Sequence, residues 1–122
     1  HLSIRRQRQM CIRDRSNGAR AGLIGFVGGL ARQTVRHNVT INNLLPGAFA
    51  TDAQARHIRG MLEQTGKTFE QLWDERGRAS PAGRYGQPEE LGALCAYVCS
   101  AQASYMTAQN ILLDGGGYPG TY

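Results

Sequence analysis

The chain has 122 residues, of which 41% are hydrophobic, and this composition predicts one folded domain rather than a disordered tail. No apolar run approaches the roughly 18 residues that a membrane helix needs. The charged amino terminus also lacks the apolar segment of a secretory signal. We therefore expect a cytoplasmic protein with no membrane contact. The formal charge of +5 leaves nucleic acid to be considered as a partner.

The excess of positive charge is confined to the start of the chain. Residues 1–15 hold five arginines against one aspartate, or +4, whereas the remainder has nine basic against eight acidic residues, or +1. Residues 9–14 read Gln-Met-Cys-Ile-Arg-Asp, the translation of a transposon-end adapter used to prepare sequencing libraries. We interpret residues 1–15 as a non-native leader that shares no core with the body, residues 16–122. A native basic arm is the alternative. Without the leader, no nucleic-acid partner is expected.

Residues 17–37 have the spacing of an amphipathic helix. Leu23, Phe26 or Val27, and Leu30 recur every three or four residues and form one apolar stripe. A second stripe consists of the glycines at positions 18, 22, 25 and 29. Because each glycine costs a helix about 1 kcal/mol relative to alanine, the stripe predicts a helix that another backbone approaches closely.

A short β-branched segment, residues 39–45, predicts a strand that ends at Pro46 and Gly47. Proline cannot continue a central ladder, and glycine permits a turn or the close approach of a ligand. The strand therefore ends where a binding loop is expected.

The more polar residues 52–78 predict a flap of two short helices, which lies outside the core layers. One helix is expected near residues 53–64, and Thr68 is suited to cap the second. We expect Trp73, in the second helix, to pack against the protein rather than to bind a ligand.

A further helix is predicted to begin at Pro88, because proline suits the first helical position and two glutamates follow in the first turn. Its expected buried face comprises Leu91, Leu94, Cys95 and Val98. Cys95 and Cys99 lack the His or Asp partners of a metal site, so no metal is expected. We interpret both cysteines as small, buried, reduced side chains.

A last strand is predicted at residues 110–114, which are followed by three glycines. The order helix, strand, flap, helix, strand is typical of an α/β fold. Two strands rarely make a stable open sheet alone. We therefore expect the C-terminal half of a doubly wound parallel-sheet Rossmann domain, without its front strands.

Three motifs in the body resemble the short-chain dehydrogenase/reductase family. Each alone is weak, but their order and separations together are specific, and the resemblance covers residues 16–122. The motifs are Asn42-Asn43-x-x-Pro46-Gly47-x-x-x-Thr51, Arg84-Tyr85-Gly86-x-Pro88-Glu89-Glu90 and Thr107-x-Gln109-x-x-x-x-Asp114-Gly115-Gly116.

The resemblance implies an enzyme that binds NAD or NADP. In the family, the turn matching Pro46 and Gly47 borders the nicotinamide. The backbone near Phe49 and the hydroxyl matching Thr51 contact its carboxamide and the phosphates. The resemblance also implies a variable substrate lid at residues 52–78 and a homo-oligomer formed through the long helix and the last strand.

Two family features are missing from this sequence. The glycine-rich phosphate loop is absent, and Gly25-x-x-Gly28-Gly29 does not replace it because it lies within a helix and follows no strand. The family's catalytic tyrosine and lysine are matched in position by Ser16 and Arg20. We assign these two residues to the catalytic positions and expect Arg20 to position the cofactor through its guanidinium. Ser16 is expected to cap the helix rather than to donate a proton.

The leading hypothesis is a nicotinamide-dependent oxidoreductase. It would transfer a hydride between the cofactor and a small-molecule carbonyl or alcohol, as 3-oxoacyl reductases do. The alternative is a non-catalytic Rossmann-fold nucleotide-binding or assembly protein that kept the pocket. Without a phosphate-binding helix N-terminus, the chain alone is expected to be inactive and to bind the cofactor weakly or not at all.

Overall fold

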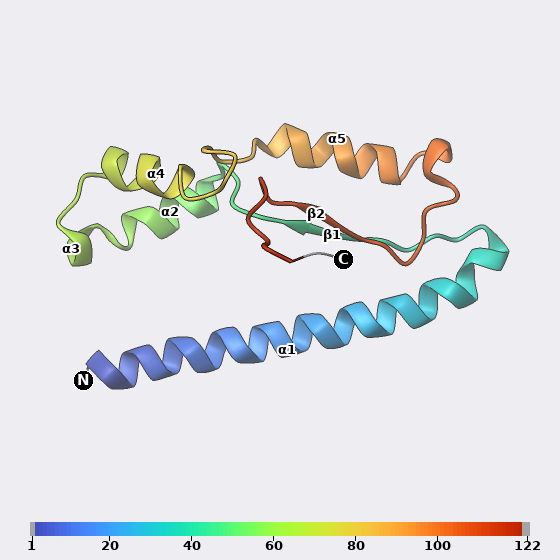
Figure 1. Cartoon of the computed structure of the whole chain (residues 1–122), viewed down its shortest axis with the longest axis horizontal. Helices are drawn as coiled ribbons and strands as arrows, with labels where there is room; N and C mark the ends of the chain where they lie inside the picture. Colours follow the sequence, from blue (N-terminus) through green and yellow to red (C-terminus); the bar gives the residue numbers. More distant parts are fainter. Residues whose placement is uncertain (1, 121–122) are drawn as a thin grey trace. The chain divides into compact units, whose positions relative to one another are not determined.

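A computed structural model describes the backbone of residues 2–120 and the side chains of residues 18–120. The chain divides into two compact units, residues 1–43 with 104–110 and residues 44–103 with 111–122. In the described part of the chain, no helix is both long and apolar enough to span a bilayer. The elements are α1 (Leu2–Thr34), η1 (Val35–His37), β1 (Asn43–Pro46), α2 (Asp52–Arg59), α3 (Leu62–Thr65), α4 (Phe69–Gly77), α5 (Pro88–Val98), η2 (Ala101–Ala103) and β2 (Asn110–Leu113) (Figure 1).

Helix α1 begins well before the predicted start at residue 17. Its first residue is Leu2, because no glycine or proline stands between residues 2 and 17 and the arginines and glutamines there favour helix. Ser16 therefore lies inside the helix, and its predicted role as N-cap is wrong. The prediction that the leader shares no core concerns side chains outside the described residues.

The end of the first helical region agrees with the sequence. α1 passes into the 3-10 turn η1, and Asn38 closes this turn in the left-handed region, with φ of 58°. The Asn38 N–H donates to the Val35 carbonyl at 3.0 Å. Asparagine is one of the few non-glycine residues that adopt this conformation at low cost.

The glycine stripe of α1 faces open space. A Cβ built on Gly18, Gly22, Gly25 or Gly29 would meet no described atom within 4 Å. Next to the stripe, 68% of Phe26 is exposed. The closely approaching backbone that the stripe predicts is therefore not supplied by the described residues of this chain.

Strands β1 and β2 pair in parallel in a two-stranded sheet. The Asn43 N–H donates to the Gln109 carbonyl at 2.8 Å, and the Gly47 N–H donates to the Leu113 carbonyl at 2.9 Å. Both partners advance by the same number of residues, as the parallel register requires. The predicted last strand is thus confirmed.

Strand β1 is shorter than predicted because side chains take the place of ladder bonds before Asn43. The Ile41 N–H donates to the Thr107 hydroxyl at 3.2 Å, and the Asn42 side-chain amide donates to the Met106 carbonyl at 2.9 Å. These bonds hold residues 41 and 42 next to the segment before β2 without a regular strand.

Ala108 lies in this segment with φ of 58°, a left-handed conformation that costs an L-residue about 1–2 kcal/mol. We expect Ala108→Gly to raise the free energy of unfolding by about 1 kcal/mol, less than the full cost because glycine also loosens the unfolded chain. Urea denaturation followed by circular dichroism measures the change.

Ala96→Gly is the matched control, because Ala96 is exposed and lies in the right-handed helix α5. It should lower the free energy of unfolding by about 1 kcal/mol. Equal losses in both variants would contradict a strained Ala108.

The flap contains three helices where the sequence predicts two. The predicted helix at 53–64 is divided into α2 and α3, because α2 ends at Gly60, which serves as its C-cap. The second predicted start is confirmed. The Thr68 hydroxyl accepts from the Gln71 N–H at 3.2 Å, and the Gln71 side chain accepts from the Thr68 N–H at 3.1 Å.

The flap has a small core of its own. Ile58 is fully buried, and Leu72 and Tyr85 are 3% and 5% exposed. Trp73 stacks on Phe69 and on Tyr85, with ring centroids 5.6 Å and 4.5 Å apart. This confirms the prediction that Trp73 packs within the protein.

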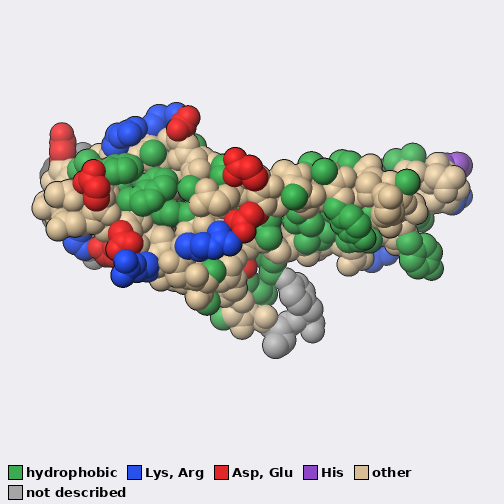
Figure 2. Space-filling model, turned by 90° about the horizontal axis from the view of Figure 1, so that it is seen from above, with side chains coloured by type: hydrophobic (Ala, Val, Ile, Leu, Met, Phe, Trp, Pro, Cys, Tyr) green, Lys and Arg blue, Asp and Glu red, His purple; other side chains and the backbone are tan. Residues whose placement is uncertain are grey.

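Charges of both signs lie side by side on the flap (Figure 2). Lys67 pairs with Glu75, and the Arg78 guanidinium donates to the Asp74 carboxylate at 3.0 Å. Lys67 lowers the pKa of the Glu75 carboxyl through a hydrogen bond and its charge. These exposed pairs contribute little to the stability of the fold.

Helix α5 begins at Pro88 as predicted, but part of its expected buried face is wrong. Leu91, Leu94 and Val98 are half-buried, whereas Cys95 and Cys99 are exposed free thiols. Successive helical residues are rotated by about 100°, so Cys95 points away from the stripe that begins at Leu91. The interpretation of both cysteines as buried side chains is therefore incorrect.

Candidate functional site

The loop of residues 47–51 leaves β1 at the carboxyl end of the sheet, where α/β proteins bind their ligands. Gly47 begins the loop, and a Cβ at this position would lie 2.6 Å from Asp114 Cα. The approach of Asp114 therefore requires glycine here, independently of any ligand. The Gly47 N–H bond to Leu113 holds this end of the loop to β2.

The middle of the loop is joined to the turn of residues 84–87. The Ala50 N–H donates to the Gly86 carbonyl at 2.8 Å, and the Gly86 N–H donates to the Ala48 carbonyl at 3.0 Å. Phe49 and Gly86 thus form an isolated parallel bridge. A Cβ at Gly86 would lie 2.7 Å from Phe49 Cε1, so the ring lies directly on the glycine.

Thr51 ends the loop and caps α2. Its hydroxyl oxygen accepts from the Gln54 N–H at 3.2 Å. A hydroxyl carries one proton as well as its acceptor lone pairs, so Thr51, which is exposed, still has a donor to offer. The residue can therefore cap the helix and bind an acceptor at the same time.

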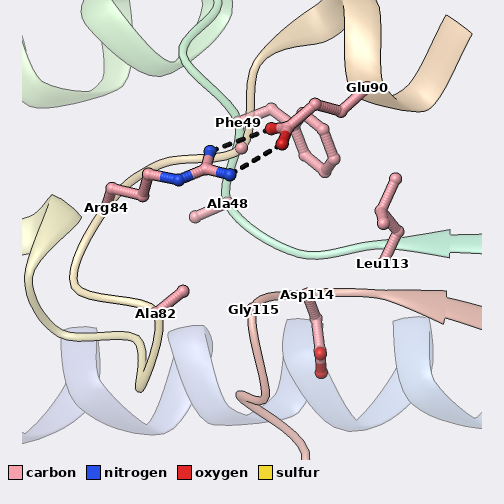
Figure 3. A pocket seen from close by; sticks show the side chains of 9 residues that line it. Ala48, Phe49, Ala82, Arg84, Glu90, Leu113, Asp114 and Gly115 are labelled. Atoms are coloured by element: carbon pink, nitrogen blue, oxygen red, sulfur yellow. Dashed lines mark hydrogen bonds and ion pairs between the residues drawn. The ribbon is translucent and has the colours of Figure 1, made fainter. Parts of the chain in front are cut away.

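Arg84 and Glu90 form a bidentate ion pair beside the loop (Figure 3). Arg84 Nη1 donates to Glu90 Oε2 at 2.9 Å and Nη2 donates to Oε1 at 2.7 Å. The Arg84 hydrogen bond and the Gln87 N–H lower the pKa of Glu90 to about 2, from an ordinary value of 4.5. A lowered carboxyl pKa stabilises the fold above the ordinary value, and the contribution disappears as the pH falls through the lowered one. The pair therefore stays ionised in neutral and mildly acidic solution.

A small pocket of about 110 Å³ lies between the loop, the ion pair and the end of β2. Figure 3 shows the Asp114 carboxylate directed away from the ion pair. This carboxylate accepts from the N–H groups of Gly116 and Tyr118 at 3.0 Å and 2.8 Å. Sites for drug-sized ligands measure roughly 300–1,000 Å³, so this pocket has room for part of a dinucleotide only. Its lining residues are Ala48, Phe49, Ala82, Arg84, Gly86, Glu90, Leu113, Asp114 and Gly115.

The structure places the predicted cofactor residues in two groups. Pro46, Gly47, Phe49 and Thr51 lie together at the end of β1, in the second unit. Arg20 is exposed on α1, in the first unit. The side chain of Ser16, the other predicted catalytic residue, lies outside the described residues.

The ion pair was not predicted from the sequence. Glu90 is interpreted there only as a favourable charge at a helix N-terminus. The three-residue spacing from Gln87 to Glu90 is that of a capping box, and the structure contains this box. The capping signal could have placed Glu90 next to the turn of residues 84–87, but it does not identify Arg84 as the partner.

Comparison with known proteins assigns the chain to a family. A family model described as enoyl-(acyl carrier protein) reductase matches residues 3–117. The chain belongs to the short-chain dehydrogenase/reductase family. The resemblance drawn from the three sequence motifs is therefore confirmed.

Two curated relatives show how much of a family member the chain represents. The NADPH-dependent reductase BacG of Bacillus subtilis is 33% identical over 96 residues, which are 79% of this chain and 37% of BacG. The 3-oxoacyl-[acyl-carrier-protein] reductase FabG of Vibrio cholerae is 34% identical over 100 residues, or 82% of this chain and 36% of FabG. The chain thus spans little more than a third of the length of these short-chain reductases.

Solved structures confirm the α/β fold. YwfH, an NADPH-dependent reductase involved in bacilysin biosynthesis, superimposes with a TM-score of 0.74 at 32% identity, over 83% of this chain and 38% of YwfH. The L-sorbose reductase of Gluconobacter frateurii gives a TM-score of 0.79 at 24% identity, over 86% of this chain and 40% of the reductase. At that lower identity, the second likeness shows the fold alone.

Proposed function

We propose that the chain is the part of an NAD(P)-dependent oxidoreductase that holds the nicotinamide end of the cofactor and covers the substrate. The observation that carries this proposal is the loop of residues 47–51, held at the carboxyl ends of β1 and β2 by Leu113 and Gly86. The reductase names of BacG and FabG support the reaction class. The substrate class is a small carbonyl compound or alcohol, of which a 3-oxoacyl group is one.

The residues present fit the nicotinamide end of such a cofactor. The loop offers the exposed backbone at Pro46 and Gly47, the half-buried Phe49 and the free hydroxyl donor of Thr51. Arg20 adds a charged guanidinium that can donate to a ribose or phosphate oxygen. The cofactor, when bound, supplies the hydride, and these residues orient it.

Ser16 does not donate the proton in this proposal. The family's tyrosine has an unperturbed pKa near 10, which a neighbouring ammonium lowers further. A serine hydroxyl is much less acidic and reaches less far from the backbone. Ser16 also lies inside α1 with no histidine next to it in sequence. The proton therefore comes from another group.

A non-catalytic nucleotide-binding or assembly protein is the second candidate. The observation in its favour is the Ser16 and Arg20 pair in place of the family's tyrosine and lysine. In both cases we propose a cytoplasmic homo-oligomer. The exposed apolar side chains of α1, Leu23 at 57% and Phe26 at 68%, support this assembly. Residues 1–15 remain a proposed non-native leader.

The test is a chimera in which residues 16–122 replace the matching part of BacG. We expect the chimera to bind NADPH and to oxidise it with members of a ketone panel. Ser16→Ala should leave turnover unchanged, and Ser16→Tyr should raise it by restoring a phenol at the family position. NADPH fluorescence and absorbance measure binding and turnover.

Each result of this experiment separates the two candidates. Binding without turnover, with activity created by Ser16→Tyr, supports the non-catalytic protein. A chimera that folds but does not bind NADPH overturns the proposed function. Loss of turnover in Ser16→Ala with unchanged cofactor affinity would show that the serine is catalytic. The isolated chain is the control and should bind NADH and NADPH more weakly than micromolar, because it lacks the phosphate loop.

A further inference from the structure

We propose that the Arg84–Glu90 ion pair positions the loop of residues 47–51, and through it the nicotinamide end of the cofactor. The part that concerns the cofactor rests on the proposed function. Arg84 and Glu90 are positioning residues here, since they act through the loop and not on the reacting atoms.

The first step is the attachment of a turn to a helix. Glu90 stands in the first turn of α5 and accepts from Arg84 through both carboxylate oxygens and from the Gln87 N–H at 2.7 Å. Arg84 Nη1 donates in addition to the Tyr85 carbonyl at 2.9 Å. Two charged side chains thus fix the turn of residues 84–87 to the rigid start of α5.

The second step passes from the turn to the loop. Gly86 is bonded to Ala48 and Ala50 through its backbone, and its hydrogen in the Cβ direction meets the ring of Phe49. On the other side, Gly47 is bonded to Leu113. The loop is therefore held between two anchors, and the turn of residues 84–87 is the one that depends on the ion pair.

The third step is that this effect can be separated from overall stability. The Arg84 and Glu90 side chains are 57% and 42% exposed. Exposed ion pairs contribute little to global unfolding, so loss of this one should loosen the loop without unfolding the domain. Replacing Arg84 also leaves the Glu90 cap on the Gln87 N–H in place.

The pocket shows what the loosening would change. Arg84 and Glu90 form one wall, and Phe49 and Ala48 form the wall that the loop supplies (Figure 3). A loop that is no longer held through Gly86 would let Phe49 leave its place on the glycine. A loop contact to the nicotinamide would then be displaced without the removal of any contacting group.

The direct test uses this chain and nuclear magnetic resonance. The Gly86 Hα that faces the Phe49 ring should show a ring-current displacement, and Arg84→Gln should abolish most of it. The same variant should raise amide exchange at Ala50 by about fivefold, since local opening governs exchange there. Arg84→Lys, which keeps the charge and one donor, should restore part of both signals.

Glu75→Gln is the matched control, because it removes the exposed pair with Lys67 in the flap. It should leave the Gly86 resonance and Ala50 exchange unchanged. The inference fails if Arg84→Gln behaves like Glu75→Gln, or if Arg84→Gln changes exchange equally across the whole second unit.

A second measurement concerns the cofactor. In the chimera with BacG, Arg84→Gln should raise the NADPH Kd by about fivefold and change kcat by less than about twofold, the pattern of a lost ground-state contact. An unchanged Kd together with a displaced Gly86 resonance would overturn the cofactor step. If the unsubstituted chimera does not bind NADPH, the proposed function fails, while the resonance experiment still decides whether the ion pair positions the loop.

Discussion

Gly47→Ala is expected to lower the free energy of unfolding by about 3 kcal/mol, near the top of the range for overpacked sites. The new Cβ would lie 2.6 Å from Asp114 Cα and 2.8 Å from Asp114 Cβ. Neither strand end can retreat easily, because Gly47 is bonded to Leu113 at this point. The variant should therefore lose pairing at the carboxyl end of the sheet. Urea denaturation followed by circular dichroism gives the magnitude.

Gly92→Ala is the matched control for this substitution. Gly92 lies inside α5, and a Cβ there would meet nothing within 4 Å. Alanine should stabilise this helix by about 1 kcal/mol. If Gly47→Ala proves as stable as Gly92→Ala, the strand ends are not in close contact.

Ile58→Ala is expected to lower the free energy of unfolding by about 2–5 kcal/mol, the range for large-to-small changes in a core. Ile58 is fully buried, and the flap has few other buried side chains to fill the space. The flap should lose its packing before the rest of the second unit. Trp73, the single tryptophan, stacks on Phe69 and Tyr85 and reports this change through its fluorescence.

Leu23→Ala is the control of equal chemistry, because Leu23 is 57% exposed on α1. Removal of an exposed side chain should change stability by about 0.5 kcal/mol or less. A denaturation midpoint shared by Leu23→Ala and Ile58→Ala would contradict the role given to the flap core.

The elements that could be predicted from the sequence are those with local signals. Thr68 begins a helix through its hydroxyl, and Pro88 does so through its fixed φ. The start of α1 could not be predicted in this way, because residues 2–16 contain nothing that breaks a helix. The exposure of Cys95 also escaped prediction, since its side chain lies only one residue beyond Leu94 in the half-buried stripe.

The candidate site divides along the same line. The end of a strand at Pro46 indicates a ligand loop, and the loop does lie at the carboxyl end of the sheet. Its attachment to Gly86 depends on a contact between residues far apart in the chain, which spacing alone does not reveal. The roles of Ser16 and Arg20 come from position within the family and stay predictions.

The parallel pairing of β1 and β2 also determines the order in which the chain can fold. Ile41 and Thr107 meet although 66 residues separate them, so this contact must close a long loop before it gains any stability. The helices of the flap need only near neighbours and can form earlier. Until β2 has been synthesised, β1 remains an unpaired strand edge, and such edges promote association between chains. The most vulnerable period of this protein therefore lies late in its synthesis, before residues 110–113 become available.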